Sequence, residues 1–145
     1  MQLLRKQVPV YAVADGLLSR PAGWTDAVII QHDDPFEQGK KIWTFYSGMS
    51  SANGTDTLIV EVFPIGAKHV PVKAGQLLGY QGSWSGNPQW PMWIHVYFGL
   101  VRATGNFPES FTSFTIQNPS EHLGLQLKPQ TEATNMQPLT CANRQ

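Results

Sequence analysis

Residues 27–32 read Ala-Val-Ile-Ile-Gln-His and are followed by Asp33-Asp34-Pro35, and this segment is the strongest indication of the fold class. A short apolar, β-branched run that stops at such a breaker is typical of a buried strand. Residues 38–40, Gln-Gly-Lys, close the loop, and residues 41–46, Lys-Ile-Trp-Thr-Phe-Tyr, form the returning strand. The two segments therefore predict an antiparallel hairpin.

Further short strands are predicted on both sides of this hairpin, at residues 8–13, 58–63, 77–81 and 94–101. In residues 58–63 the side chains alternate, so Leu58, Val60 and Val62 are expected on one side of a strand. Convincing helical periodicity is absent over most of the chain.

The composition indicates one all-β domain followed by a tail. The 145 residues are 41% hydrophobic and include 13 Gly and 11 Pro, which fits short strands joined by many turns. A weak echo between residues 8–16 and 70–75 favours an antiparallel sandwich or flattened barrel. From residue 128 the chain is polar and without pattern. Residues 1–127 are therefore predicted to form the domain, and residues 128–145 a mobile polar tail.

Charge and cysteine content restrict the possible functions. Ten basic and ten acidic residues give a net charge of zero, which does not favour electrostatic binding to nucleic acid or to an anionic membrane. The single cysteine, Cys141, allows neither an intramolecular disulfide nor a cysteine zinc site. No apolar run reaches the roughly 18 residues that a membrane span needs. The N-terminal residues lack the apolar core of a signal peptide.

Residues 91–98, Pro-Met-Trp-Ile-His-Val-Tyr-Phe, have the form of a metallopeptidase strand that has lost part of its chemistry. A His-x-His pair on a strand places both imidazoles on one face, because strand side chains alternate. One imidazole then binds a metal while the other handles a proton. Here Trp93 stands in the first position and His95 in the second. On such a strand both side chains are expected to point into the same cleft.

Five segments, taken in order, resemble the lysostaphin-type, or LytM-like, zinc endopeptidases, which cut peptide cross-links in bacterial cell walls. They are Val-Tyr-Ala-Val-Ala-Asp-Gly (10–16), Val-Ile-Ile-Gln-His (28–32), Thr-Phe-Tyr-Ser-Gly-Met-Ser (44–50), Val-Lys-Ala-Gly-Gln-Leu-Leu-Gly (72–79) and Trp-Ile-His-Val (93–96). The resemblance implies an antiparallel β-fold of the duplicated hybrid motif type, with an open groove for a glycine-containing or stem peptide. It also implies a location at the cell envelope or outside the cell, and peptidoglycan or a cell-envelope protein as partner.

The resemblance implies roles for only a few positions of this chain. In the family, zinc is held by an early His and Asp and by the second His of the His-x-His strand, and two further His assist the attacking water. His95 matches the third zinc ligand, whereas Trp93 and Gly48 stand where the two assisting His belong. The early motif belongs just upstream of residues 8–10, where Arg5 and Lys6 offer no zinc ligand.

Two hypotheses follow from this pattern. Catalytic zinc needs about three protein ligands, so His95 alone is at most a residual metal ligand. The first hypothesis is a catalytically inactive LytM-like domain that needs no cofactor and acts as a binding or scaffold module. The alternative is a fragment of an active zinc-dependent peptidoglycan endopeptidase whose N-terminal ligands are missing from this chain.

The other histidines are expected to be structural or solvated. His32 ends a buried strand, and Asp33 beside it faces the opposite way, so His32 is predicted to be a hydrogen-bonded structural residue. His69 and His122 lie in predicted turns, the latter within a short helical turn at residues 119–123 that Asn118 caps. Both are expected to be solvated.

Three tryptophans, Trp84, Trp90 and Trp93, lie within one loop-and-strand segment. The resemblance places this segment beside the substrate groove, where exposed indole faces bind sugars or peptides. The competing explanation is that the indoles fill the space that the lost metal site leaves. A serine nucleophile is not predicted, because the chain has no Gly-x-Ser-x-Gly elbow.

Overall fold

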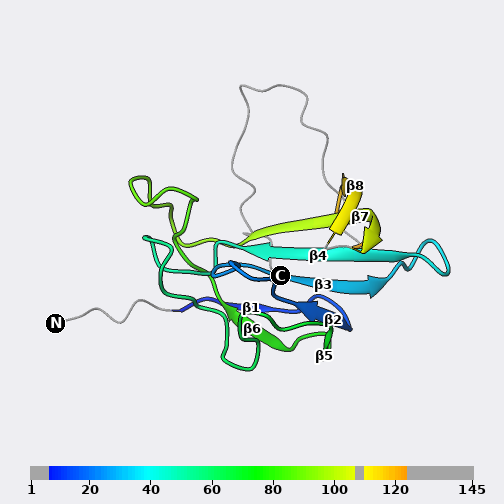
Figure 1. Ribbon diagram of the computed structural model, residues 1–145, viewed down its shortest axis with the longest axis horizontal. Helices are drawn as coiled ribbons and strands as arrows, with labels where there is room; N and C mark the ends of the chain where they lie inside the picture. The colour runs from blue at the N-terminus through cyan, green and yellow to red at the C-terminus, as the bar shows by residue number, and fades with distance from the viewer. Residues whose placement is uncertain (1–6, 107–109, 124–145) are drawn as a thin grey trace, which may run out of the picture.

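The computed structural model describes residues 7–106 and 110–123, and this part of the chain forms two antiparallel sheets without any helix (Figure 1). The six-stranded sheet has the order β5-β2-β3-β4-β7-β8, and the two-stranded sheet pairs β1 with β6. The strands are β1 (Pro9–Tyr11), β2 (Gly16–Ser19), β3 (Val28–Asp33), β4 (Lys41–Ser47), β5 (Val70–Val72), β6 (Leu77–Tyr80), β7 (Tyr97–Asn106) and β8 (Ser110–Gln117).

The predicted all-β antiparallel class is confirmed, but the sheets do not close into a barrel. The six-stranded sheet ends at β5 on one side and at β8 on the other. β5 has the sequence Val-Pro-Val, and a proline lacks the N–H that further pairing needs, so such a strand belongs at an edge. The flattened barrel is therefore wrong as the alternative architecture.

The β3–β4 hairpin is present as predicted, with Val28 opposite Tyr46 and Asp33 opposite Lys41. Its apolar run is continuous because both faces of β3 are covered. Val28 and Ile30 join the main core, which lies between the two sheets. Ile29 faces the other way and packs in a smaller cluster. The main core also contains buried side chains from both sheets and from the loops between them, including Val10, Leu18, Tyr46, Met49, Ile59, Phe63, Val72 and Leu78.

The prediction of a strand at residues 58–63 is wrong. The segment pairs briefly with β6, since the Val60 N–H donates to the Leu78 carbonyl at 3.0 Å, and then turns as the Phe63 N–H donates to the Val60 carbonyl at 3.0 Å. Because of this turn the alternation does not define one buried face: Phe63 is buried and Val62 is exposed.

The short turn at residues 119–123 is confirmed. The Leu123 N–H donates to the Pro119 carbonyl at 3.0 Å, and the Ser120 N–H donates to Asn118 Oδ1 at 3.0 Å, which is the geometry of a side-chain N-cap. The predicted tail at residues 128–145, including Cys141, lies outside the described residues.

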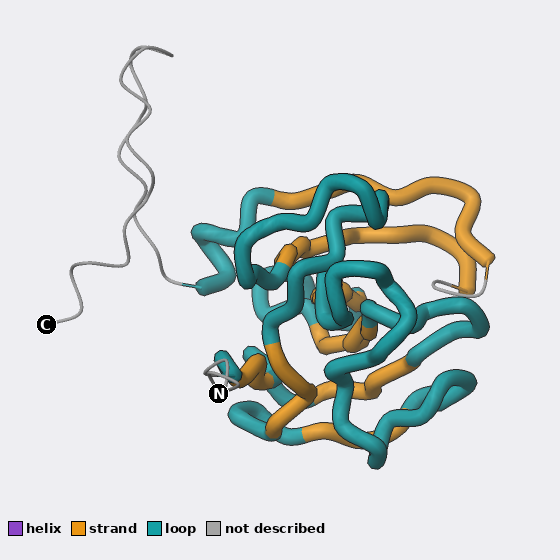
Figure 2. The backbone as a smooth tube through the Cα atoms, turned by 90° about the vertical axis from the view of Figure 1, so that its left-hand side faces the viewer, coloured by secondary structure: helices purple, strands orange, loops and turns teal. Residues whose placement is uncertain are grey.

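Loops make up most of one end of the molecule. Figure 2 looks onto this end and shows loops in front of the strands. The loops that meet here follow β4, precede β3 and join β6 to β7, so they bring together segments that are distant in the sequence.

Candidate functional site

The loop between β6 and β7 carries His95 back against the segment that follows β4. β7 begins at Tyr97, so His95 precedes the strand in which it was predicted. It is held by two backbone hydrogen bonds with Gly82, of 3.1 and 3.0 Å, and the Ser83 N–H donates to the Ser50 carbonyl at 3.1 Å. A side chain at position 82 would overlap the backbone oxygens of Gly48 and Ser50. The close approach of the two segments therefore requires glycine at this position.

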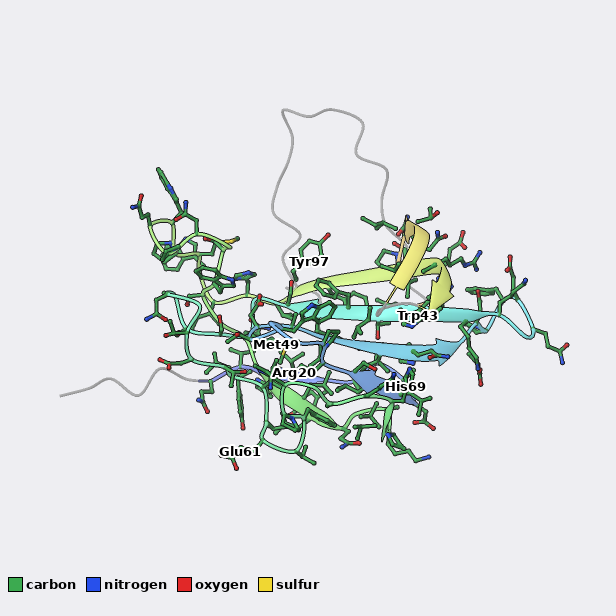
Figure 3. The ribbon with its side chains drawn as sticks, viewed as in Figure 1. Arg20, Trp43, Met49, Glu61, His69 and Tyr97 are labelled. Atoms are coloured by element: carbon green, nitrogen blue, oxygen red, sulfur yellow. The ribbon has the colours of Figure 1, made fainter. Side chains whose placement is uncertain are left out.

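A cleft of about 310 Å³ opens above this contact. Its lining comes from the end of β4 and the residue after it, from the β6–β7 loop, from the first residue of β7 and from one residue before β3: Asp26, Ser47, Gly48, Trp84, Ser85, Gly86, Met92, His95 and Tyr97. Figure 3 shows Tyr97 projecting from the sheet at the start of β7.

Gly48 and His95 meet at this cleft. Gly48 has a φ of +85°, a conformation that favours glycine. A Cβ at this position would lie 2.8 Å from His95 Nε2. The structure therefore brings together two of the positions that the resemblance assigns to one site.

The His95 ring has a defined orientation. Its Nδ1 lies 2.8 Å from the Trp93 carbonyl oxygen. A carbonyl only accepts hydrogen bonds, so Nδ1 carries the hydrogen and the Nε2 of the neutral ring keeps its lone pair. Nε2 faces Gly48 in the cleft. An imidazole held in this way is able to accept a proton or bind a metal.

Asp26 is a cleft residue that sequence reasoning missed. Its Oδ2 accepts a hydrogen bond from the Gly48 N–H at 3.1 Å, and its carbonyl accepts one from the Met49 N–H at 2.9 Å. Asp26 therefore fixes the turn that follows β4. No local motif marks this residue, because its partners come from a different part of the chain.

Arg20 is a second residue that the sequence did not reveal. It is buried, and its guanidinium donates to the carbonyls of Trp24 and Phe63, each at 2.8 Å, and to the Thr25 carbonyl and Thr57 Oγ1, each at 3.0 Å. Figure 3 places its side chain within the body of the molecule. Burial lowers the pKa of Arg20, and the charge of Asp26 opposes this change. Arg20 thus ties the β2–β3 loop to the long connection between β4 and β5, at the end that carries the cleft.

The three candidate tryptophans have different environments. Trp84 lines the cleft and lies against Gly54, where a Cβ would meet its ring at 3.0 Å. Trp90 and Trp93 are 71% and 94% exposed and do not line the cleft.

The expectation that Trp93 shares a strand face with His95 is wrong. The Trp90 N–H donates to the Asn87 carbonyl at 3.0 Å, forming a turn just before Pro91. β7 begins only at Tyr97, so Trp93 lies in the loop before it and the alternation of strand side chains does not apply there. Nor do Trp90 and Trp93 fill the interior.

His32 is a hydrogen-bonded structural residue, as predicted. It is buried, with Nδ1 2.7 Å from the Asp15 carbonyl and Nε2 2.7 Å from Thr44 Oγ1. The Thr44 hydroxyl is also bonded to the Tyr46 hydroxyl at 3.2 Å, and the latter accepts the Val13 N–H at 3.2 Å. Burial lowers the pKa of His32, although its hydrogen bond to Asp15 opposes the change. A neutral ring, with Nδ1–H donating and Nε2 accepting, satisfies both partners.

Asp33 does not converge with His32, because it is exposed and forms an ion pair with Lys41. His69 is exposed, as predicted.

The prediction that His122 is solvated is wrong. Both of its ring nitrogens are buried without a hydrogen-bond partner in the described part of the chain, and its ring packs edge-on against Phe36 at 4.7 Å between centroids. With His32 it lines a second, mostly apolar cavity of about 470 Å³. The capped turn carries His122 over this cavity instead of into solvent.

The described residues do not fit a catalytic zinc site. Within residues 7–106 and 110–123, no group of three or more His, Cys, Asp or Glu side chains is placed to hold a metal ion. His95 is therefore one candidate ligand where about three are needed.

A scan against protein-family models and searches of curated proteins and of solved structures give no match. Over the range that the structure describes, the chain contains no helix of the length and hydrophobicity needed to cross a membrane.

Proposed function

We propose that this chain is a LytM-like domain of the duplicated hybrid motif type that binds a cell-wall peptide in the cleft without cleaving it. The observation that carries the proposal is the contact between Gly48 and His95 at the cleft. These positions are distant in the sequence, and the resemblance assigns both to the site of the family's chemistry. Their proximity is expected if the resemblance reflects a shared architecture.

The lining of the cleft suits an extended peptide with small side chains. Gly48 and Gly86 leave the cleft without side-chain bulk at two positions, and Ser47 and Ser85 bring hydroxyl groups. The rings of Trp84 and Tyr97 supply apolar faces. Apolar surface with a few placed polar groups is the usual make-up of a ligand site. A glycine-containing or stem peptide is the ligand class proposed here.

Binding without cleavage follows from the residue at position 48. Peptide hydrolysis needs groups that activate a water molecule and stabilise the oxyanion. Gly48 has no side chain for either task, and Trp93 is not part of the cleft lining. His95 brings a single imidazole, whose Nε2 lone pair is able to accept a hydrogen bond from a peptide N–H. One ring cannot both activate a water molecule and stabilise the oxyanion.

One observation favours the alternative, a fragment of an active zinc endopeptidase. The orientation of His95, with Nδ1 bonded to the Trp93 carbonyl and Nε2 facing the cleft, is the one that a zinc ligand adopts. Zinc binding by the chain therefore separates the two functions.

The binding proposal is tested by calorimetry with a pentaglycine peptide and with a purified stem peptide. Tyr97→Ala removes an exposed ring from the cleft and should weaken binding by about 1–3 kcal/mol. Its melting temperature should fall only slightly, because the ring also contacts Phe45 edge-on. Tyr11→Ala is the matched control, since Tyr11 is 52% exposed against 55% for Tyr97 and lies on β1, outside the cleft. If the parent binds neither peptide nor purified peptidoglycan, or if both variants weaken binding equally, the proposal fails.

A further inference from the structure

In the β6–β7 loop, four large apolar side chains lie close together in the sequence: Trp90, Met92, Trp93 and Ile94. The two indoles, Trp90 and Trp93, form an apolar tip, whereas Met92 also lines the cleft. All four side chains are exposed, at 71%, 51%, 94% and 41%. In Figure 1 this loop projects beyond the end of the sheets, and Figure 3 shows its side chains extending outward. Single exposed apolar residues are common, but a contiguous group of large ones marks an interaction site. We propose that this tip inserts into the interfacial layer of a zwitterionic lipid bilayer.

The β6–β7 loop carries no charged Asp, Glu, Lys or Arg side chain. From residue 74 to residue 101 the sequence contains no Asp, Glu, Lys or Arg. Moving a charged side chain out of water is costly, so an uncharged segment is the one that is able to enter a lipid interface. The lack of Lys and Arg also removes the attraction that anionic lipids would provide. A bilayer without net charge therefore matches the tip.

The exposed side chains of this loop are of the types that suit a lipid interface. Trp is enriched at membrane interfaces, where its ring contacts acyl chains and its N–H stays near the polar headgroups. Met92 and Ile94 add aliphatic surface, which favours acyl chains over a sugar face. Trp90 and Trp93 lie outside the cleft lining, so the tip is a protrusion rather than a groove for a peptide. A shallow membrane surface accommodates this shape without a complementary pocket.

Hydrogen bonds and prolines already order the β6–β7 loop. Its base is closed by hydrogen bonds between Gly82 and His95, and the Met92 N–H donates to the Ser83 carbonyl at 3.0 Å. Pro88 and Pro91 restrict the backbone. Insertion therefore loses little conformational freedom, which would otherwise weaken binding.

The test uses the full chain and vesicles of phosphatidylcholine alone, followed by flotation. The parent should float with the vesicles, and this binding should persist at high salt because it involves no ion pairs. The double variant W90A/W93A should bind at least about tenfold more weakly, since each indole contributes a large apolar surface. Brominated acyl chains should quench the fluorescence of the parent, and that quenching should be lost in the variant.

The matched control is V62A/I65A, which removes exposed apolar side chains from a different loop. It should float as the parent does. Equal binding by the parent and W90A/W93A, or binding that needs anionic lipid and disappears at high salt, overturns the proposal. So does a parent that stays unbound to vesicles but associates through its tip with peptidoglycan or with a second copy of the chain. Peptide binding in the cleft is measured separately with Tyr97→Ala, so failure of one proposal leaves the other intact.

Discussion

His32 and His95 carry the same side chain but differ in what their second ring nitrogen meets. In both, Nδ1 donates to a backbone carbonyl. The Nε2 of His32 is bonded to Thr44 inside the protein, whereas the Nε2 of His95 faces Gly48 in the cleft. His32 is thereby committed to stability, and His95 remains able to bind a ligand.

The environment of His32 should make stability depend on pH. Because burial lowers the pKa of His32 in the folded protein, the unfolded chain takes up a proton at higher pH than the folded protein. The free energy of unfolding should therefore fall as the pH drops below about 6.5, and level off once the folded protein is also protonated. Denaturant unfolding between pH 7.5 and about 5.5 measures this change, above the range in which carboxylates titrate.

The variant His32→Gln should lose this part of the pH dependence, even if its stability is lower at every pH. His69→Asn is the control, because His69 is exposed in a turn with a φ of +50°, which Asn tolerates. An unchanged pH dependence in His32→Gln contradicts the assignment.

A substitution at Gly48 should also change the stability of the protein. Gly48→Ala should destabilise the protein through its positive φ and through contact with His95, by about 1–3 kcal/mol. Gly39→Ala is the control, since Gly39 has a φ of +79° and open space around its Cβ position. In a His95→Ala background, Gly48→Ala should cost no more than Gly39→Ala does. Chemical denaturation of the four variants decides whether the two positions are coupled.

Among the elements, the loops rather than the strands build the cleft, and Arg20 holds them together. It bonds to the loop before β3, to Thr57 in the loop after β4 and to Phe63 near the following turn. Asp26 then attaches the first of these loops to Gly48. The shape of the cleft therefore depends on the hydrogen bonds that Arg20 and Asp26 make between these loops.

Replacing Arg20 should be strongly destabilising. Arg20→Met removes the donor from the buried Phe63 carbonyl and from two half-buried carbonyls, and Arg20→Lys keeps the charge but loses the planar fork that reaches them. Each variant should lower the free energy of unfolding by about 3 kcal/mol or more, measured by denaturant titration. Lys40→Met, at an exposed position in the β3–β4 turn, should leave stability nearly unchanged. A small effect of Arg20→Met would show that water replaces these bonds.

For the whole molecule, cleft and tip lie on the same loop but face different surroundings. Trp84 and Met92 line the cleft, while Trp90 and Trp93 extend into solvent. One loop thus connects the proposed peptide site with the proposed lipid contact. Because the net charge of the chain is zero, neither interaction is expected to rely on long-range electrostatic attraction.

The intact chain should hold well under one zinc per molecule after dialysis, because one matched ligand is too few. Cell-wall turbidity and pentaglycine-cleavage assays should equal the control without protein, with or without added zinc. Stoichiometric zinc by elemental analysis that is lost in His95→Ala, together with chelator-sensitive cleavage, would favour the active alternative instead.

The local features of this protein could be predicted from its sequence. The β3–β4 hairpin, the capped turn after Asn118 and the structural role of His32 follow from alternation, breakers and capping chemistry, which act between neighbouring residues. These local patterns did not predict that Gly48 and His95 share one site. That prediction came only from the family resemblance.

Only the tertiary structure decided where the cleft residues lie. Arg20 and Asp26 act through partners from other loops, and Trp93 lies exposed in the loop before β7 rather than in the predicted strand. In the same way, the turn at Phe63 removes the strand that the alternation of its segment predicts. The physical reason is that backbone hydrogen bonds and close packing between distant segments outweigh local side-chain patterns wherever the two compete.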